Sequence, residues 1–194
     1  MKTIYSQIIT ILLVSAVTLS CKAQTLPLNT LMEDIPNGAY LKDLNNELSL
    51  YLGVYKSNFG NNEITLFITK ETQKLIHSSS KDFYKDVLSI RYIVKDSSGN
   101  ILQNTANMSF QQNQLKFTVY SMSTRPTQSI VTLYYGGTNC GIGWGKITLK
   151  KLNATQLSWE YEPNGLLIDS ATCPPSTDKT VYLPVTKDLI FTKQ

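Results

Sequence analysis

The sequence has little of what metal binding and common forms of catalysis require. Among its 194 residues there is one histidine, and charged residues make up only 16% of the chain. A zinc site needs three or four His, Cys or carboxylate ligands, and three cysteines with one histidine fit that need poorly. The histidine, His77, lies in a polar stretch that predicts an exposed loop residue, and no Gly-x-Ser-x-Gly elbow is present. We therefore expect neither a cofactor nor an enzyme.

A dense basic stripe is also missing. The formal net charge is +4, and the clearest basic run is Lys150 and Lys151, with Lys146 nearby. A nucleic-acid-binding surface needs a more concentrated patch of lysine and arginine than this. These lysines are typical of a solvated strand face, so no nucleic-acid partner is expected.

Long apolar runs are absent after the first 20 residues. Near the start, Lys2 is followed by a short apolar run at 8–17 and then by small residues. That run is shorter than the roughly 20 residues that a membrane-spanning helix needs, and the three-part pattern is typical of a signal peptide. The sequence therefore predicts export, with residues 1–20 as the leader.

Two cleavage sites compete at the end of this leader. Ser20 before Cys21 fits a lipoprotein signal, although Thr18 stands where such signals usually have leucine. Cleavage after Ala23 would instead release a secreted protein. We favour a lipid anchor on Cys21, which predicts a protein of the cell envelope that is attached to a membrane and faces the periplasm or lies in the outer membrane.

The cysteine count is odd, which agrees with one cysteine carrying a lipid. Cys140 and Cys173 then remain, and disulfides persist in exported proteins. We predict a Cys140–Cys173 disulfide, with two unpaired buried thiols as the alternative.

Patterning divides the exported chain into a tether at 21–37 and a single β-rich domain at 38–194. Leu41, Leu44 and Leu48 share one helical face, which predicts a short N-terminal helix over 39–48. From residue 53 onward apolar residues alternate with a period of two, as in sheets with one buried face. The predicted strands lie at 50–56, 64–69, 87–94, 114–120, 130–135, 143–151, 156–162, 180–185 and 189–192. The fold class expected is all-β, an antiparallel meander barrel or sandwich.

Three features could carry chemistry. The glycine-rich run at 134–146 fits neither a P-loop nor a dinucleotide pattern, and we expect its alternating Gly141, Gly143 and Gly145 to admit a bulky neighbour on one strand face. Glu160 and Glu162 share a strand face at a spacing that glycoside hydrolases use, but an exposed acidic face is the commoner cause. The aromatic residues Trp144, Trp159, Tyr134 and Tyr135 could line a ligand pocket inside a barrel or simply fill it, and filling is favoured.

Four blocks of the chain resemble a Bacteroidota-type family of small secreted proteins and lipoproteins that is classed as a domain of unknown function. The blocks are EDIPNGAYLKDLNNELSLYLGVYKSN (33–58), NEITLFITK (62–70), YYGGTNCGIGWGKITLKKLNATQLSWEY (134–161) and YLPVTKDLIFTK (182–193). The resemblance implies export and supplies no activity or site residue. Residues 52–55 are also similar to the Gly-x-Trp opening of lipocalin-type barrels, with Tyr55 in place of the tryptophan.

Three functions follow as hypotheses. The first is a non-catalytic, lipid-anchored envelope protein with an interaction or structural role, whose partners are the membrane and an envelope protein. The second is a lipocalin-like barrel that binds a small apolar or amphipathic ligand. The third, with the least support, is a hydrolase that uses Glu160 and Glu162.

Overall fold

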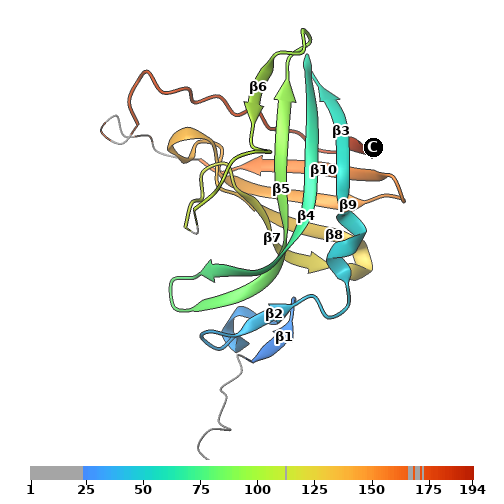
Figure 1. Cartoon of the computed structure of the whole chain (residues 1–194), viewed down its shortest axis with the longest axis vertical. Helices are drawn as coiled ribbons and strands as arrows, with labels where there is room; N and C mark the ends of the chain where they lie inside the picture. Colours follow the sequence, from blue (N-terminus) through green and yellow to red (C-terminus); the bar gives the residue numbers. More distant parts are fainter. Residues whose placement is uncertain (1–23, 112, 166–167, 169–170, 172) are drawn as a thin grey trace, which may run out of the picture.

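Eight antiparallel strands close into a barrel in the computed structural model, which describes residues 24–111, 113–165, 168, 171 and 173–194 (Figure 1). The strands are β3 (Gly53–Phe59), β4 (Asn62–His77), β5 (Asp82–Lys95), β7 (Val119–Arg125), β8 (Ile130–Tyr135), β9 (Gly145–Lys151), β10 (Gln156–Pro163) and β11 (Leu189–Lys193). Each pairs with its neighbour in this series, and β11 returns to β3. The predicted antiparallel meander is confirmed, and it is a barrel rather than a sandwich.

The barrel is completed where β5 meets β7. Only two residue pairs make this contact, Ser89 with Tyr120 and Ile90 with Val119. Elsewhere the same edge of β5 pairs with two short strands outside the barrel. Strand β6 (Ile101–Asn104) pairs near one end, and β2 (Tyr40–Lys42) pairs in parallel near the other.

No α-helix forms over 39–48, so that prediction is wrong. Tyr40 and Leu41 belong to β2, and only the 3-10 helix η2 (Glu47–Tyr51) follows. Two tertiary contacts explain the difference. The backbone of β2 pairs with β5, and the buried Asp43 carboxylate accepts hydrogen bonds from the N–H groups of Glu47 and Leu48, which starts the short helix there.

Two predicted strands are also wrong in part or in whole. Residues 114–118 form a turn in which Phe117 has a φ of +65°, and the strand begins only at Val119. Residues 180–185 form no strand, yet Leu183 is buried and the Pro184 carbonyl accepts a hydrogen bond from Trp159 Nε1 at 2.9 Å. This segment therefore covers part of the barrel without joining its ladder. The other 3-10 helices in the described residues are η1 (Met32–Asp34), η3 (Pro126–Gln128) and η4 (Asn139–Gly141).

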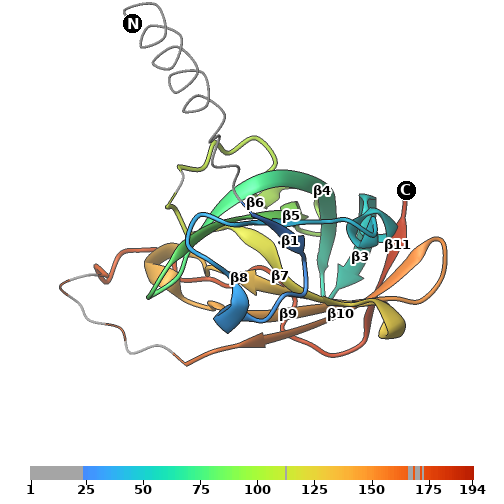
Figure 2. The same ribbon diagram turned by 90° about the horizontal axis from the view of Figure 1, so that it is seen from below.

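The described part of the expected tether, residues 24–37, packs on the domain. Strand β1 (Thr25–Pro27) pairs in parallel with β2, and both lie at one end of the barrel (Figures 1 and 2). Leu28 and Ile35 are buried, and Lys81 Nζ donates hydrogen bonds of 2.7 Å to the carbonyls of Met32 and Ile35. Residues 24–37 are therefore held against the domain by pairing, burial and hydrogen bonds. No helix among the described residues is both long and apolar enough to cross a bilayer. The predicted leader and Cys21 lie outside the described residues.

The interior of the barrel is filled by aromatic side chains. Trp159 lies in ring contact with Tyr161 and Phe191, at centroid distances of 6.4 and 5.6 Å, and Tyr135 connects Tyr161 with Tyr92. All five side chains are fully or almost fully buried. Their polar atoms have partners, as buried polar groups require; Tyr92, for example, reaches Gln103 Oε1 at 2.7 Å. The expectation of filling is met at Trp159 and Tyr135. It is not met at Tyr134, an outward residue of β8 that lines a groove outside the barrel, or at Trp144, which is half-buried before β9.

A buried ionic network lies beside the bulge in β4. The Asp86 carboxylate accepts hydrogen bonds from the Tyr40 hydroxyl at 2.6 Å and from the backbone N–H of Asp43 and of Gln73. Lys70 Nζ lies 2.8 Å from Asp43 Oδ2 and 3.8 Å from Asp86 Oδ2. Gln73 has a φ of +53° at the bulge in β4, so this bond holds a backbone conformation that would otherwise be unfavourable. The network joins β2, β4, β5 and η2.

Trp159→Ala is expected to destabilise the domain strongly, because it empties the centre of the ring cluster and leaves the Pro184 carbonyl unpaired. The expected loss in free energy of unfolding is about 3–5 kcal/mol. Glu160→Ala, on the outer face of the same strand, is the matched control and should change stability by less than about 0.5 kcal/mol. Urea unfolding followed by circular dichroism measures both, and equal losses would contradict the filled interior.

Candidate functional site

The acidic pair considered from the sequence lies on the outer face of β10, and each carboxylate has a lysine partner. Glu162 Oε2 is 2.8 Å from Lys146 Nζ, and Glu160 Oε1 is 3.7 Å from Lys187 Nζ. The hydrogen bond from Lys146 lowers the pKa of Glu162. A general acid needs a raised pKa, so these surroundings favour a solvated, ionised surface over hydrolytic chemistry.

The only histidine is exposed, as predicted, but it is the last residue of β4 and not a loop residue. His77 Nδ1 lies 2.9 Å from Asp82 Oδ1, at the facing position of β5. No third side chain continues this pair among the hydrogen bonds of the described residues. The pair closes the β4–β5 hairpin.

The glycine-rich run makes close packing possible. A Cβ on Gly143 would lie 2.6 Å from the side chain of Val181, and one on Gly145 would collide with the backbone of Glu162. The predicted packing role is therefore correct. The predicted common strand face is wrong, because Gly141 ends η4, Gly143 lies in the turn before β9, both have left-handed φ values, and only Gly145 lies in the strand.

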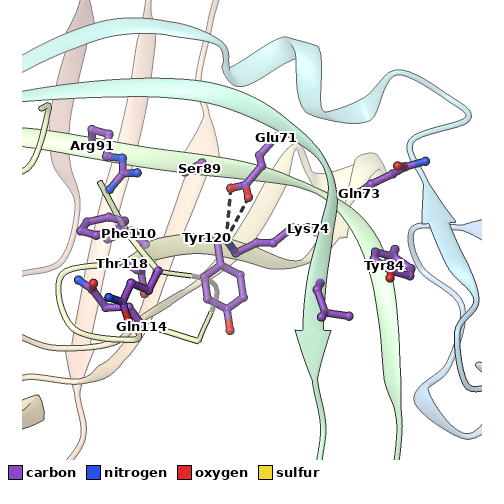
Figure 3. A pocket seen from close by; sticks show the side chains of 13 residues that line it. Glu71, Gln73, Lys74, Tyr84, Ser89, Arg91, Phe110, Gln114, Thr118 and Tyr120 are labelled. Carbon is purple, nitrogen blue, oxygen red and sulfur yellow. Dashed lines mark hydrogen bonds and ion pairs between the residues drawn. The ribbon is translucent and has the colours of Figure 1, made fainter. Parts of the chain in front are cut away.

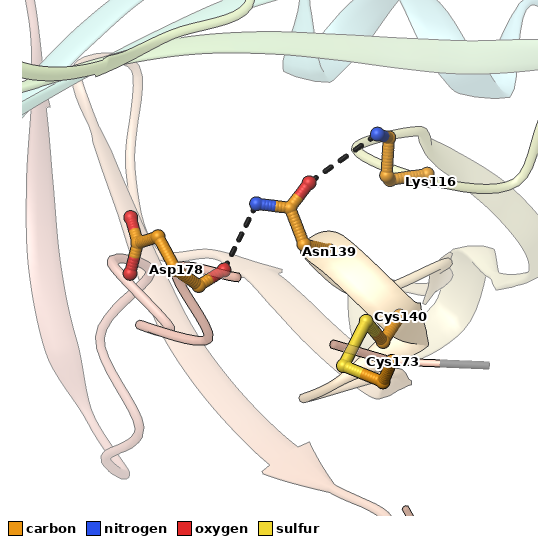
Figure 4. Close-up of a disulfide and its surroundings, with 5 residues drawn as sticks. All are labelled: Lys116, Asn139, Cys140, Cys173 and Asp178. Carbon is orange, nitrogen blue, oxygen red and sulfur yellow. Dashed lines mark hydrogen bonds between the residues drawn. A yellow bond between two sulfur atoms is a disulfide. The ribbon is translucent and has the colours of Figure 1, made fainter. Parts of the chain in front are cut away.

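Cys140 and Cys173 form the predicted disulfide, with Cα atoms 5.7 Å apart (Figure 4). Beside it, Asn139 donates a hydrogen bond to the Asp178 carbonyl at 2.9 Å and accepts one from Lys116 Nζ at 3.3 Å. The bridge and these bonds hold three separate segments together: the turn before β7, η4 and the chain after residue 173. The contacts around the disulfide therefore serve to hold the fold together.

A polar pocket of about 360 Å³ lies outside the barrel, between β4, β5, the start of β7 and the loop before it (Figure 3). We call it the Arg91 pocket. Its lining residues are Glu71, Gln73, Lys74, Leu75, Tyr84, Ser89, Arg91, Phe110, Gln111, Gln114, Thr118, Val119 and Tyr120. Ser89 and Arg91 come from outward positions of β5. Residues 88, 90 and 92 of this strand face the core, so the period of two places 89 and 91 on the outer face.

Charge in the Arg91 pocket is not balanced. Lys74 Nζ lies 3.1 and 3.3 Å from the two oxygens of Glu71 and 5.5 Å from the centre of the Tyr120 ring. Arg91 Cζ lies 3.6 Å from the centre of the Phe110 ring, and Arg91 Nη1 is buried without a hydrogen-bond partner among the described residues. Burial lowers the pKa of Arg91, although an arginine stays protonated at physiological pH. The pocket therefore carries one net positive charge, on Arg91.

A second, largely apolar groove of about 540 Å³ lies between the N-terminal segment and the outer wall of the barrel. We call it the N-terminal groove; Leu28, Leu31, Met32 and Met122 are among its lining residues. Lys85 also lines it, almost completely buried, and its Nζ donates a 2.5 Å hydrogen bond to the Met122 carbonyl. Burial lowers the pKa of Lys85 to about 8, against the opposing effect of the Glu47 charge.

Sequence reasoning singled out neither Arg91 nor Lys85. Alternation places both on the outward face of β5, where a charged side chain is ordinary. Their burial comes from segments distant in sequence, the loop around Phe110 and the N-terminal segment. No local pattern in β5 predicts that covering.

Lys85→Met should raise stability near pH 7, and the gain should shrink as pH rises. The folded-state pKa of about 8 is below the unfolded value of about 10.4, so between these values the unfolded chain binds more protons and the wild type becomes more stable with pH. The stability difference between Lys85→Met and wild type should fall by about 1–2 kcal/mol between pH 7 and 9.5. Paired urea titrations measure it, and tyrosine ionisation cancels in the difference. A difference that does not change with pH would show that Lys85 is not desolvated.

The comparisons with known proteins identify a family but no individual relative. No match was found among curated proteins or among solved structures. One family model matches residues 1–194, the whole chain, and its description is a family of unknown function. The chain therefore belongs to the family of unknown function DUF6705.

Proposed function

We propose that this protein is a non-catalytic, lipid-anchored component of the bacterial cell envelope that binds its ligand or partner on the outer wall of the barrel. The three-part leader and the small residue before Cys21 support export and lipid attachment. The resemblance of four sequence blocks to Bacteroidota-type secreted proteins and lipoproteins supports the same location.

The filled interior is the observation that carries this proposal. Lipocalin-like binding would need space inside the barrel, since an eight-stranded barrel is just wide enough either to be filled by side chains or to hold one small ligand. Here the interior holds the Trp159 ring cluster, with fully buried Tyr55 and Leu66. The Arg91 pocket and the N-terminal groove both lie outside the barrel wall. Surface binding is therefore better supported than an apolar ligand in the interior.

The start of the fold is suited to a membrane anchor. Thr25, the first residue of β1, is four residues after Cys21, a separation that an extended chain spans in at most about 14 Å. A lipid on Cys21 would therefore hold the N-terminal end of the barrel close to the bilayer. Leu31 and Met32, in the segment that follows β1, are 62% and 51% exposed. Apolar side chains at such a position favour contact with lipid over contact with water.

Lipid attachment predicts that a fatty-acid analogue supplied to the cells labels the wild-type protein and that Cys21→Ser removes the label. Cys140→Ser is the matched control, because it removes a cysteine without touching the leader, and it should keep the label. The measurement is in-gel detection of the analogue after purification. An unlabelled wild type, or equal labelling of Cys21→Ser, would favour cleavage after Ala23 and a secreted protein.

Trp159 offers a direct test of whether ligands enter the barrel. The chain has two tryptophans, so Trp144→Phe leaves Trp159 as the only reporter in the interior. Titration of this variant with palmitate should leave its emission unchanged, because the ring cluster already occupies that space. Trp159→Phe, which keeps the partly exposed Trp144, is the control for binding at the surface. Saturable quenching of Trp159 alone would support the lipocalin-like alternative instead.

A further inference from the structure

Arg91 stands out because its guanidinium has no hydrogen-bonded partner in the part of the chain that the structure describes. Among the described residues it makes one close contact, the stacking of its Cζ 3.6 Å above the centre of the Phe110 ring. Nη1 is buried and unpaired, while the side chain as a whole remains partly exposed and lines the pocket. A guanidinium presents five N–H donors in a planar fork, and partly buried arginines normally use them. The stacking on Phe110 holds this fork in place without satisfying it.

The nearest carboxylate does not satisfy Arg91. Both oxygens of Glu71 lie within 3.3 Å of Lys74 Nζ, and no ion pair joins Glu71 to Arg91. Figure 3 shows the Glu71–Lys74 pair and the Arg91 guanidinium at separate positions around the same pocket. Glu71 still acts on Arg91 through its charge at a distance. One positive charge therefore remains, which a single negative charge would balance.

The other walls of the pocket are suited to a hydroxylated molecule. Ser89 lies two residues before Arg91 on the same face of β5, about 6–7 Å away, and its hydroxyl makes no hydrogen bond to another described residue. The side-chain amide of Gln111 is likewise free of hydrogen bonds within the described part of the chain. Tyr120 adds an aromatic ring at the opposite side. Donors, acceptors and a ring around a volume of about 360 Å³ fit a ligand of monosaccharide size.

We propose that the Arg91 pocket binds a small hydroxylated carboxylate of monosaccharide size, such as an acidic sugar. The carboxylate accepts two parallel hydrogen bonds from Arg91, the geometry that arginine provides and lysine does not. The hydroxyl groups of the ligand bond to Ser89 and Gln111. A singly charged carboxylate matches the single unbalanced charge better than a doubly charged phosphate does. The inference rests on the proposed surface-binding function and names the ligand class for it.

The test is a titration of the protein without its leader and lipid, with three sugars as ligands. Binding is monitored through the amide NMR signals of the residues around the pocket. Glucuronate is the acidic probe, glucose is the neutral control, and glucose 6-phosphate tests whether a phosphate serves as well. Glucuronate should shift the signals of Ser89, Thr118 and Tyr120 in a saturable way, with glucose at least tenfold weaker. Glucose 6-phosphate should also bind more weakly than glucuronate.

Variants identify the residue responsible. Arg91→Gln should weaken glucuronate binding at least tenfold, and Arg91→Lys, which keeps the charge but loses the fork, should weaken it nearly as much. Lys56→Gln is the matched control, because Lys56 is a surface lysine paired with Glu63 on β3 and β4, outside the pocket, and its loss should leave binding unchanged. If Arg91→Gln fails to fold, Arg91→Lys and the comparison of glucuronate with glucose on the wild type decide the question.

Four outcomes would overturn the inference. Equal binding of glucose and glucuronate would show that charge plays no part, and unchanged binding by Arg91→Gln would show that Arg91 is not the ligand contact. Tighter binding of glucose 6-phosphate than of glucuronate would replace the carboxylate with a phosphate. A wild type that binds none of the three sugars would also reject the inference, while the fatty-acid labelling of Cys21 would still report separately on the proposed anchoring.

Discussion

The backbone of β5 is the constraint on which the rest of the structure depends. This strand pairs with β4 along nearly its whole length, while its other edge is divided among β6, β7 and β2. Because the barrel is completed by only two residue pairs between β5 and β7, the remainder of that edge would be exposed without further partners, and exposed strand edges promote aggregation. The segments that cover it, the loop after β6 and the N-terminal strands, are also the segments that form the two pockets. Edge protection and pocket formation therefore have the same cause.

The interior and the outer wall have different roles. Inside, the aromatic rings around Trp159 occupy the space and their polar atoms reach partners such as Pro184 and Gln103, which leaves little room or unused polarity for a ligand. Outside, the wall carries the buried Lys85 and the partly buried Arg91, whose Nη1 is shielded from water, and burying charge is unfavourable unless something compensates for it. A function based on recognition is thus more easily built on the wall than in the interior.

Sequence patterning predicted the parts of the fold in which local and tertiary preferences agree. The alternation in 130–135 and 156–162 corresponds closely to β8 and β10, because one face of each meets the core and the other meets water. It failed at 39–48, where pairing with β5 and the Asp43 carboxylate outweigh a leucine pattern of helical period. It also missed the Arg91 pocket, because Phe110 and the loop around it lie far from β5 in sequence and carry no motif. The disulfide was predictable because the lipid expected on Cys21 would leave only Cys140 and Cys173 to form it.

Lys85 and Arg91 show how a structural charge differs from a binding charge on one strand face. Both are outward residues of β5 covered by chain from outside the barrel. Lys85 donates to the Met122 carbonyl, so a partner within the protein already compensates part of its burial, and burial lowers its pKa toward the neutral form. Neither applies to Arg91, because its guanidinium has no hydrogen-bonded partner among the described residues and does not deprotonate at physiological pH. An anion from outside the chain would compensate this charge, and Arg91 lines a pocket that can admit one.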